Sequence, residues 1–283
     1  MKLLRSLLLF VWCLLIVLPF GVKAESKKAY TLAVVPQMRV SEIYVKWTPF
    51  VKKLSQELGV AIELKPYNTI QQFEADLLKG KMDFAFMNPY EEVLAKDAQG
   101  YIPLIKDATN LVGILVAHKG GGIDSVKDLN GKEIAFPAPN AFAASLYVRA
   151  LLTEKEKIQF TARYVKTHSN VYKTVVVDKT VAAGGGVTKT LMKEPAEIRN
   201  ELIIIYETPS TASHPLSAHP RVPDALRKKM IRAILNLAND KTNKELFSNI
   251  LIPEPVLADY QKDYLPLKKL ELMLEKYTVT GAE

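Results

Sequence analysis

The sequence is poor in cysteine: among its 283 residues only Cys13 is of this type. Cys13 lies in an apolar stretch near the N-terminus that we predict to be removed, which leaves a chain without any thiol. Disulfide bridges, thiolate nucleophiles and cysteine-based zinc sites are therefore excluded. Stability must then come from the burial of apolar side chains.

Long apolar runs are also scarce. The longest spans residues 6–21, about 16 residues, whereas a helix needs about 20 to span a bilayer. Lys2 and Arg5 precede this run, a proline and a glycine end it, and small residues up to Ala24 follow, which is the pattern of a secretory signal peptide. We predict that residues 1–24 are a signal peptide cleaved after Ala24 and that the protein works in the periplasm.

The chain lacks clusters of charge of one sign. Its formal net charge is +8; three of the 38 basic residues lie in the predicted signal peptide, so 35 basic and 30 acidic residues leave +5. Basic residues alternate with acids, as in Lys155-Glu156-Lys157, which indicates a solvated surface. A nucleic-acid partner would require a concentrated basic patch, so we exclude this class of partner.

Short apolar runs with the character of strands alternate with amphipathic segments along the remaining chain, which predicts an α/β fold with mostly parallel sheets. The expected strands are 30–35, 61–64, 82–87, 102–105, 111–117, 133–136, 160–165, 181–186 and 203–206. Apolar periodicity and capping residues predict the helices at 47–58, 69–80, from Asn88-Pro89, 141–152, 168–177 and 225–238, with a mainly helical tail over 245–277. The segment 207–223 is expected to be a loop.

Polar residues gather in four loops that follow these strands. In an open α/β sheet, ligands bind beyond the carboxyl ends of the strands, where loops lead into helix N-termini. Backbone N–H groups and the helix dipole favour an anionic group there. The four loops carry Asn88 with Tyr90, Asn140, His168 with Ser169, and Thr208 with His214. An alternative interpretation is that Asn140, Ser169 and Asn170 are ordinary helix caps.

Patterns typical of catalysis are missing. His168 and Ser169 are adjacent, and adjacent residues do not face each other on a helix, so they do not form a nucleophile–base pair. His214 and His219 lack the spacing of a helical zinc pair, and the run of glycines at 184–186 lacks the pattern of a phosphate-binding loop. We predict that the protein is not an enzyme and has no metal and no cofactor.

Several short motifs in order resemble the periplasmic solute-binding proteins of phosphate, phosphite and phosphonate ABC importers. They are Trp47-Thr-Pro-Phe50, Lys81-Met-Asp83 through Pro89-Tyr90, Asp128-Leu-Asn-Gly-Lys132, Ala138-Pro-Asn140 and His168-Ser-Asn170. The resemblance covers about residues 30–277. It implies a two-lobed type II periplasmic binding protein in which the chain crosses between the lobes twice. By this analogy lobe 1 holds residues 27–115 and 207–283, and lobe 2 holds 116–206.

The resemblance also implies a ligand site, and the sequence departs from it. Where family members bind phosphonyl oxygens with a Ser-Thr-Ser run, this chain has Ala141-Phe142-Ala143. Each lost hydroxyl donor is worth about 1 kcal/mol or more, so phosphonate affinity should fall by orders of magnitude. The stretches that supply acids for a ligand amine, around 180–182 and 213–215, contain no carboxylate. His168 and Tyr90 do have counterparts in the family.

We therefore expect a more apolar pocket that holds one small ligand with an anionic or carbonyl group. The predicted ligand-binding residues are Asn88, Tyr90, Asn140, Ala141, Phe142, Ala143, His168, Ser169, Thr208 and His214. The expected partner is an ABC permease, which would receive the ligand from a monomeric binding protein after a hinge closes the lobes. The alternative is a periplasmic ligand sensor that regulates a membrane-bound kinase or cyclase.

Overall fold

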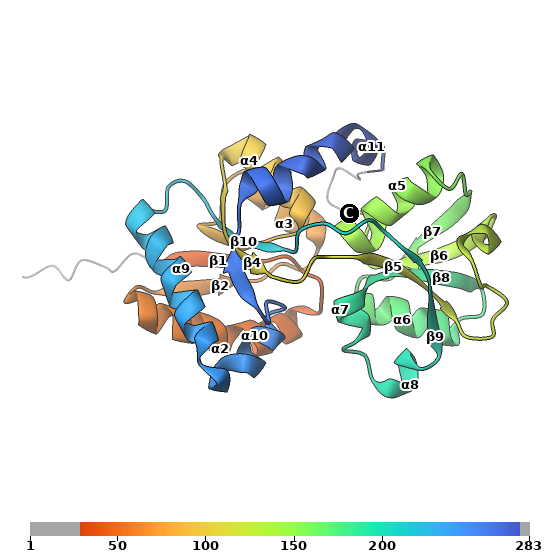
Figure 1. The fold of residues 1–283 in the computed structure, drawn as a ribbon, viewed down its shortest axis with the longest axis horizontal. Helices are drawn as coiled ribbons and strands as arrows, with labels where there is room; N and C mark the ends of the chain where they lie inside the picture. The colour runs from red at the N-terminus through yellow and green to blue at the C-terminus, as the bar shows by residue number, and fades with distance from the viewer. Residues whose placement is uncertain (1–28, 278–283) are drawn as a thin grey trace, which may run out of the picture.

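Two α/β lobes lie side by side in the computed structural model, which describes residues 29–277 (Figure 1). The predicted signal peptide and its cleavage site lie outside the described residues. Each lobe is built on one sheet, and we call the lobe with the six-stranded sheet lobe 1 and the lobe with the five-stranded sheet lobe 2. Within residues 29–277, the helices are all too short or too polar to cross a membrane.

The sheet of lobe 1 has the strand order β11-β4-β10-β3-β1-β2. Strand β1 pairs in parallel with both β2 and β3, whereas β10 is antiparallel to β3 and β4, and β11 is antiparallel to β4. The strands are β1 (Tyr30–Val34), β2 (Ile62–Lys65), β3 (Phe84–Phe86), β4 (Ile102–Asp107), β10 (Pro215–Ala218) and β11 (Pro255–Leu257). Residues of β3 and β10 are fully buried, which places these two strands at the centre of the lobe.

Helices cover this sheet because each buries one apolar stripe against it. Helix α2 turns Trp47, Phe50 and Leu54 inward and ends at Gly59, whose positive φ of 67° provides a left-handed cap. The α-helices of lobe 1 are α2 (Val40–Leu58), α3 (Ile70–Leu77), α4 (Pro89–Gln99), α9 (Asp224–Asn239), α10 (Lys244–Asn249) and α11 (Glu271–Glu275). Short helical turns lie at η3 (Lys241–Asn243), η4 (Tyr260–Tyr264) and η5 (Leu265–Leu270).

The sheet of lobe 2 has the order β7-β6-β8-β5-β9, with parallel pairs on the β7 side and antiparallel pairs on the β9 side. Its strands are β5 (Gly113–His118), β6 (Lys132–Phe136), β7 (Phe160–Tyr164), β8 (Val181–Val187) and β9 (Leu202–Glu207). Its helices are η1 (Val126–Leu129), η2 (Phe142–Leu146), α5 (Tyr147–Glu154), α6 (His168–Val177), α7 (Thr188–Leu191) and α8 (Ala196–Arg199).

Two segments cross between the lobes, one from β4 to β5 and one from β9 to β10. They run antiparallel to each other and form a bridge between Leu111 and Thr211. The backbone N–H of Gly113 donates to Thr208 Oγ1 at 3.0 Å, which ties the two crossings together where they enter lobe 2. The two-lobed α/β fold with two crossovers, expected from the sequence, is confirmed. The sheets are mixed and not mostly parallel as expected, because the strands that follow the crossing segments, β5 and β10, pair antiparallel with both of their neighbours.

The structure corrects three expectations about local structure. Strand β10 lies inside 207–223, which was expected to be a loop, and β11 interrupts the tail that was expected to be mainly helical. The helix expected over 141–152 begins as a π-helical turn, η2, and continues as α5 to Glu154.

The π-helical turn rests on two glycines of the sheet below it. A Cβ at Gly113 would lie 2.1 Å from the carbonyl oxygen of Ala143, and one at Gly185 would lie 2.0 Å from that of Ala144. Only glycine allows this approach of backbone to backbone, so the turn is seated directly on β5 and β8.

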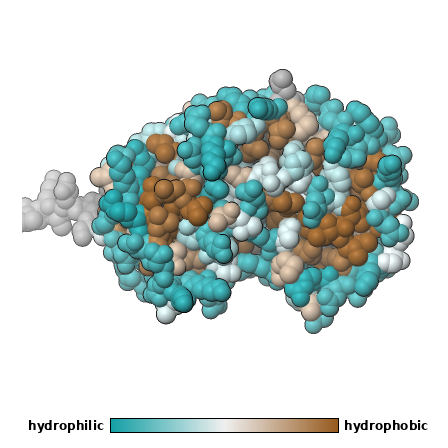
Figure 2. Space-filling model, in the orientation of Figure 1, coloured by the Kyte–Doolittle hydropathy of each residue, from teal (hydrophilic) through white to brown (hydrophobic). Residues whose placement is uncertain are grey.

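The largest apolar core of the described part does not stop at the lobe boundary. It contains the interior of lobe 1 and continues through Phe142, Leu146, Tyr147 and Val187 of lobe 2. The surface is mostly hydrophilic, with an apolar area on each lobe in the view of Figure 2. The two lobes are thus joined by apolar packing as well as by the crossing segments.

Candidate functional site

A cleft between the lobes collects six of the ten residues predicted to bind a ligand. They surround a cavity of about 20 Å³ together with residues of the loop after β1, the start of α3 and the end of β8. The six residues are Asn88, Ala141, Phe142, Ala143, His168 and His214. This convergence follows from topology, because segments after β1 and β3 of lobe 1 meet segments after β6 and β7 and the end of β8 of lobe 2 in the lining.

Asn88 caps the helix that follows it, α4. Its side chain accepts hydrogen bonds from the backbone N–H groups of Tyr90 at 3.0 Å and Glu91 at 2.8 Å, and Glu91 Oε2 accepts from the Asn88 N–H at 2.8 Å. This reciprocal capping box, followed by Pro89 in the first turn, explains why α4 begins here. Asn88 therefore shapes the wall of the cleft, while its amide oxygen is already engaged.

Phe142 is the side chain that fills the cleft. Its ring stacks on Tyr147 of its own lobe, with ring centres 5.6 Å apart and an interplanar angle of 4°, and on Tyr90 of lobe 1 at 6.1 Å and 21°. Phe142 is 2% exposed, and Ala141 and Ala143 on either side are also buried. An aromatic ladder from both lobes therefore occupies the position where the resemblance implied hydroxyl donors.

His168 begins helix α6 and is buried. The N-cap is Thr167, whose side chain accepts from the Asn170 N–H at 3.2 Å, and the predicted caps Ser169 and Asn170 lie inside the helix instead. His168 Nδ1 lies 3.3 Å from Thr190 Oγ1 of lobe 2. Burial lowers the pKa of His168 to about 4, so its ring is neutral at neutral pH.

His214 approaches the cleft from the second crossing segment. Its ring stacks on Phe86 of β3 at 5.5 Å and 25°, and its Nε2 contacts the side-chain amide of Gln37. Burial, together with the charge of Lys189, lowers the pKa of His214 to about 3. Gln37 was missed in the sequence, although it follows β1 and the rule about carboxyl ends of strands that selected Asn88 also applies to it.

Asn140 makes a contact across the cleft and does not cap a helix. Its Nδ2 donates to Glu74 Oε2 of α3 in lobe 1 at 2.8 Å. Burial raises the pKa of Glu74, while the hydrogen bond from Asn140 acts in the opposite direction. The neighbouring Glu91 is fully buried, and burial and the charge of Glu74 raise its pKa well above its ordinary value. The contact across the cleft thus involves an acid, Glu74, that no pattern in the sequence indicated.

Ser169 and Thr208 do not line this cavity. Ser169 Oγ donates to Glu194 Oε2 at 3.1 Å beside a second, larger cavity. Thr208 is buried in a crossing segment, where its hydroxyl accepts from Gly113 and donates to the carbonyl oxygen of Pro209 at 3.1 Å. Its hydrogen bonds therefore hold the two crossing segments together.

Two further contacts hold the lobes together at the edges of the cleft. Lys189 of α7 pairs with the buried carboxylate of Asp107 at the end of β4. Arg149 of α5 donates to the carbonyl oxygen of Tyr277 at 2.8 Å, so the segment after α11 reaches from lobe 1 onto lobe 2. Figure 1 shows α11 above the boundary between the lobes, next to α5. Among residues 29–277 there is no group of three or more acidic, histidine or cysteine side chains that could hold a metal ion.

Two mixed α/β lobes, two crossing segments and a cleft lined from both sides define a type II periplasmic binding fold. Over residues 32–264 the chain matches the family described as ABC transporter, phosphonate, periplasmic substrate-binding protein. The chain belongs to this family, whose members are periplasmic binding components of transporters.

Solved structures with low sequence identity share the fold. A binding protein component of an ABC phosphonate transporter from Pseudomonas aeruginosa has a TM-score of 0.76 at 17% identity, with 89% of this chain and 88% of that chain covered. PhnD1 of Prochlorococcus marinus, solved with methylphosphonate, has a TM-score of 0.78 at 16% identity, with 88% and 99% covered.

A curated relative matches over a shorter stretch. The phosphate-import protein PhnD of Mycolicibacterium smegmatis is 27% identical over 133 residues, which are 44% of this chain. The match spans 41% of the length of that relative.

Proposed function

We propose that this protein is exported to the periplasm, closes its two lobes around one small anionic ligand and delivers that ligand to an ABC importer. The observation that carries this proposal is the meeting of His168 from lobe 2, His214 from the crossing segment and Gln37 from lobe 1 at one cleft. Side chains of a binding protein that come from both lobes couple ligand binding to closure. The family supports the role in transport, since its members are binding components of ABC transporters.

The proposal includes the division of the chain that the sequence suggested. The signal peptide ends after Ala24; residues 27–115 and 207–283 were predicted to form lobe 1, and residues 116–206 lobe 2. Because β5 (Gly113–His118) and β9 (Leu202–Glu207) belong to the sheet of lobe 2, we propose that the boundaries fall just before Gly113 and just after Glu207. The mature protein acts as a monomer without a metal or cofactor. Intact mass measurement of protein recovered from the periplasm tests the cleavage site, because cleavage elsewhere changes the mass by whole residues.

Aminoalkylphosphonates are poor ligands in this proposal. The methylphosphonate complex of PhnD1 and the phosphate-import relative point to oxyanion ligands in related proteins. In this chain Phe142 and two alanines replace the implied hydroxyl donors, and the ring of Phe142 is packed between Tyr90 and Tyr147. Isothermal titration calorimetry with 2-aminoethylphosphonate should therefore show no binding at micromolar concentrations. A dissociation constant in the micromolar range or tighter would contradict this.

The main test is the identity of whatever the protein carries in its own periplasm. Native mass spectrometry of protein purified from that compartment should reveal a co-purifying anionic small molecule, and its addition to ligand-free protein should raise the unfolding temperature. Protein that carries no small molecule and is stabilised by no component of a periplasmic extract would overturn the proposal.

Ligand sensing is a second candidate function. It is favoured by the apolar packing of Phe142 against both lobes, which stabilises a closed arrangement through the protein's own side chains. A binding protein with this property can regulate a partner protein that recognises its closed conformation. Genes for a permease and an ATPase next to the gene of this protein would support transport, and a gene for a membrane-bound kinase or cyclase would support sensing.

A further inference from the structure

A second cavity lies in the same interlobe space, at the ends of two helices from opposite lobes. It measures about 140 Å³, close to the ~150 Å³ cavity known to hold a benzene molecule, and is lined by the first turns of α2 in lobe 1 and α6 in lobe 2. It shares Gln37 and His168 with the small cavity beside Phe142. There is thus room for a small ligand next to the place that Phe142 fills.

The lining of this cavity has an excess of positive charge. Four cationic and two anionic side chains line it. The cationic ones are Arg39, Lys46, Lys173 and Lys193, and the anionic ones are Glu42 and Glu194. Glu42 is shared by two cations, with Arg39 Nε at 2.6 Å and Lys46 Nζ at 3.8 Å. Glu194 accepts from the Ser169 hydroxyl. The two acids therefore leave a net charge of about two positive units, which is what a doubly negative ligand would neutralise.

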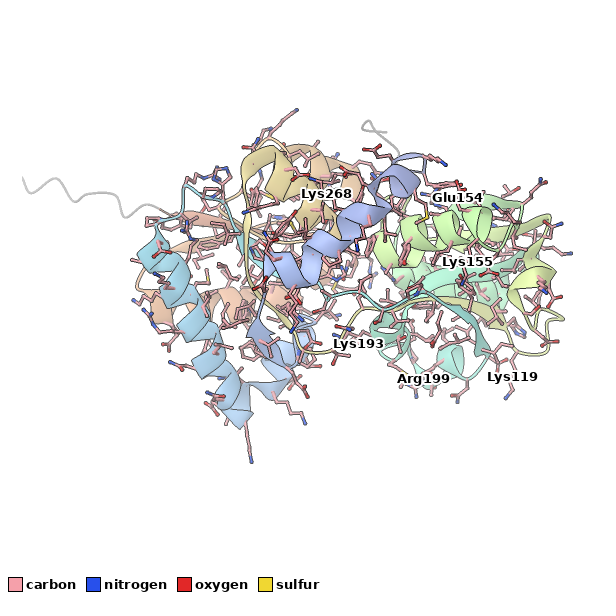
Figure 3. All side chains as sticks on the ribbon, turned by 45° about the horizontal axis from the view of Figure 1, so that its top comes forward. Lys119, Glu154, Lys155, Lys193, Arg199 and Lys268 are labelled. Carbon is pink, nitrogen blue, oxygen red and sulfur yellow. The ribbon has the colours of Figure 1, made fainter. Side chains whose placement is uncertain are left out.

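Lys193 has no carboxylate partner within residues 29–277. Its Nζ donates to the carbonyl oxygen of Ser248 in lobe 1 at 2.5 Å. Burial lowers the pKa of Lys193, and the positive charges of Lys46 and Lys189 lower it further. Lys46 of lobe 1 and Lys193 of lobe 2 thus line the same cavity with like charges, and a bound anion would offset them. In Figure 3, Lys193 lies near the boundary between the two lobes, whereas Lys119 lies at the outer edge of lobe 2.

The polar groups at the N-termini of these helices also favour an anionic ligand. Helix α2 has 19 residues and begins at Val40, and its N-cap Arg39 makes no side-chain capping bond. The N–H of Glu42 donates to the carbonyl oxygen of Arg39 at 2.9 Å, so the N–H groups of Val40 and Ser41 are the ones that the helix leaves for a ligand. His168, 6% exposed, lines the cavity, and its Nε2 has no hydrogen-bond partner in the described part of the chain. Helix N-termini from both lobes, a buried imidazole and four cations thus surround one space.

We propose that this cavity, and not the space beside Ala141–Ala143, binds the ligand, and that the ligand is a small organic or inorganic compound with at least two negative charges. This inference deepens the proposed function and depends on it. The negative groups lie among Arg39 and Lys46 of lobe 1 and Lys173 and Lys193 of lobe 2, with His168 as a polar contact. Binding between these sets of cations joins the two lobes.

The test uses the mature full-length protein and two probes, pyrophosphate and citrate, with acetate as the monovalent comparison at constant ionic strength set by sodium chloride. Calorimetry should show that pyrophosphate or citrate binds to the protein. Acetate should not bind. Binding of pyrophosphate alone would assign a phosphoryl ligand, and binding of citrate alone a carboxylate ligand. The substitution Lys193→Gln should weaken binding by about tenfold or more, since a charge-assisted contact is lost.

Lys119→Gln is the matched control, because Lys119 is an exposed lysine of the same lobe, remote from the cleft. It should leave binding unchanged. Lys46→Gln, on the opposite lobe, should weaken binding as Lys193→Gln does, and unchanged circular dichroism spectra confirm that both variants fold. Wild-type protein that binds neither polyanionic probe at millimolar concentration, or equal binding by wild type and both variants, would overturn the inference.

The same variants separate this inference from the proposed function. A ligand that co-purifies from the periplasm and loses affinity in His214→Ala, but not in Lys193→Gln, would leave the proposed function standing and place the ligand in the smaller cavity. Protein that binds no ligand of any charge would overturn both.

Discussion

Asn140 of lobe 2 and Glu74 of lobe 1 share a hydrogen bond of 2.8 Å across the cleft. Asn140 belongs to a motif that was expected to cap a helix or to bind a ligand, and Glu74 lies on a helix face to which no role was assigned. Their contact links closure of the lobes to a carboxylate whose pKa is raised by burial. The contact is therefore one of the polar interactions that opening must break.

We predict that Asn140→Ala shifts the protein toward an open arrangement. Loss of a partly buried hydrogen bond costs about 1 kcal/mol, which is enough to change a two-state population about fivefold. Small-angle X-ray scattering should show a larger radius of gyration for the variant. Asn200→Ala, an exposed asparagine at the end of α8, serves as the control and should scatter as wild type. An unchanged radius for Asn140→Ala would show that the other contacts between the lobes hold them closed without this hydrogen bond.

Restoring hydroxyl groups beside the cleft should create phosphonate affinity. In the variant Ala141→Ser, Phe142→Thr, Ala143→Ser, three hydroxyl groups replace apolar groups and the aromatic ring leaves the cleft. Titration calorimetry should show methylphosphonate binding at least about tenfold tighter than in wild type, since each new donor contributes about 1 kcal/mol.

Phe142→Leu is the matched control for this gain, because it removes the ring without adding a donor. It should not bind methylphosphonate better than wild type. Equal gains in both variants would mean that the ring acts by blocking the site, and that hydroxyl groups are irrelevant.

The ion pair between Lys189 and Asp107 should contribute to stability. Asp107 is 1% exposed, and its carboxylate also accepts from the backbone N–H groups of Thr109 at 3.0 Å and Glu254 at 2.9 Å. Lys189→Met leaves the carboxylate with these two donors, so we expect a loss of about 1–2 kcal/mol in the free energy of unfolding. Urea denaturation measures it. Lys155→Met, which removes an exposed lysine paired with Glu156 at 3.5 Å, should stay within about 0.5 kcal/mol of wild type.

Glu92 should make the protein less stable as pH rises. It is fully buried in α4, accepts a hydrogen bond from Ser217 Oγ at 2.6 Å, and burial raises its pKa to about 8. The folded state then holds a proton that the unfolded state releases above about pH 4.5, so stability is fully present below that pH and falls until about pH 8. Glu92→Gln should unfold like wild type at pH 4.5 and at a higher temperature at pH 8.

The size of this gain is on the order of a few kcal/mol. Differential scanning calorimetry at several pH values measures it, with Glu63→Gln, an exposed glutamate of β2, as the control. Equal unfolding temperatures of wild type and Glu92→Gln at pH 8 would contradict the raised pKa.

Local signals in the sequence predicted much of the fold. Thr69 caps α3 as expected, by accepting from the Gln72 N–H at 3.2 Å, and Asn88 begins α4 with a complete capping box. These features depend on neighbours within a few residues, so the sequence contains them. Strand β10 was missed because its pairing with β3 and β4 comes from partners more than 100 residues away, and the short segment Pro215–Ala218 has no periodicity of its own.

The candidate site was predictable as a set of loops, not as a set of contacts. The rule about strand ends selected His168 and His214, which do meet in one cleft, while their role in binding stays a prediction. Glu74 and Lys193 were missed because their place in the cleft depends on how one lobe lies against the other. That geometry follows from packing between distant segments, which no local pattern describes.

The packing of the π-helical turn on Gly113 and Gly185 has a consequence for how this pocket can change in evolution. Carbonyl oxygens of Ala143 and Ala144 and the two glycines seat the turn on the sheet, and these contacts do not involve the side chains at 141–143. A lineage can exchange those side chains without rebuilding the scaffold, and the same platform can then present hydroxyls in one descendant and an aromatic ring in another.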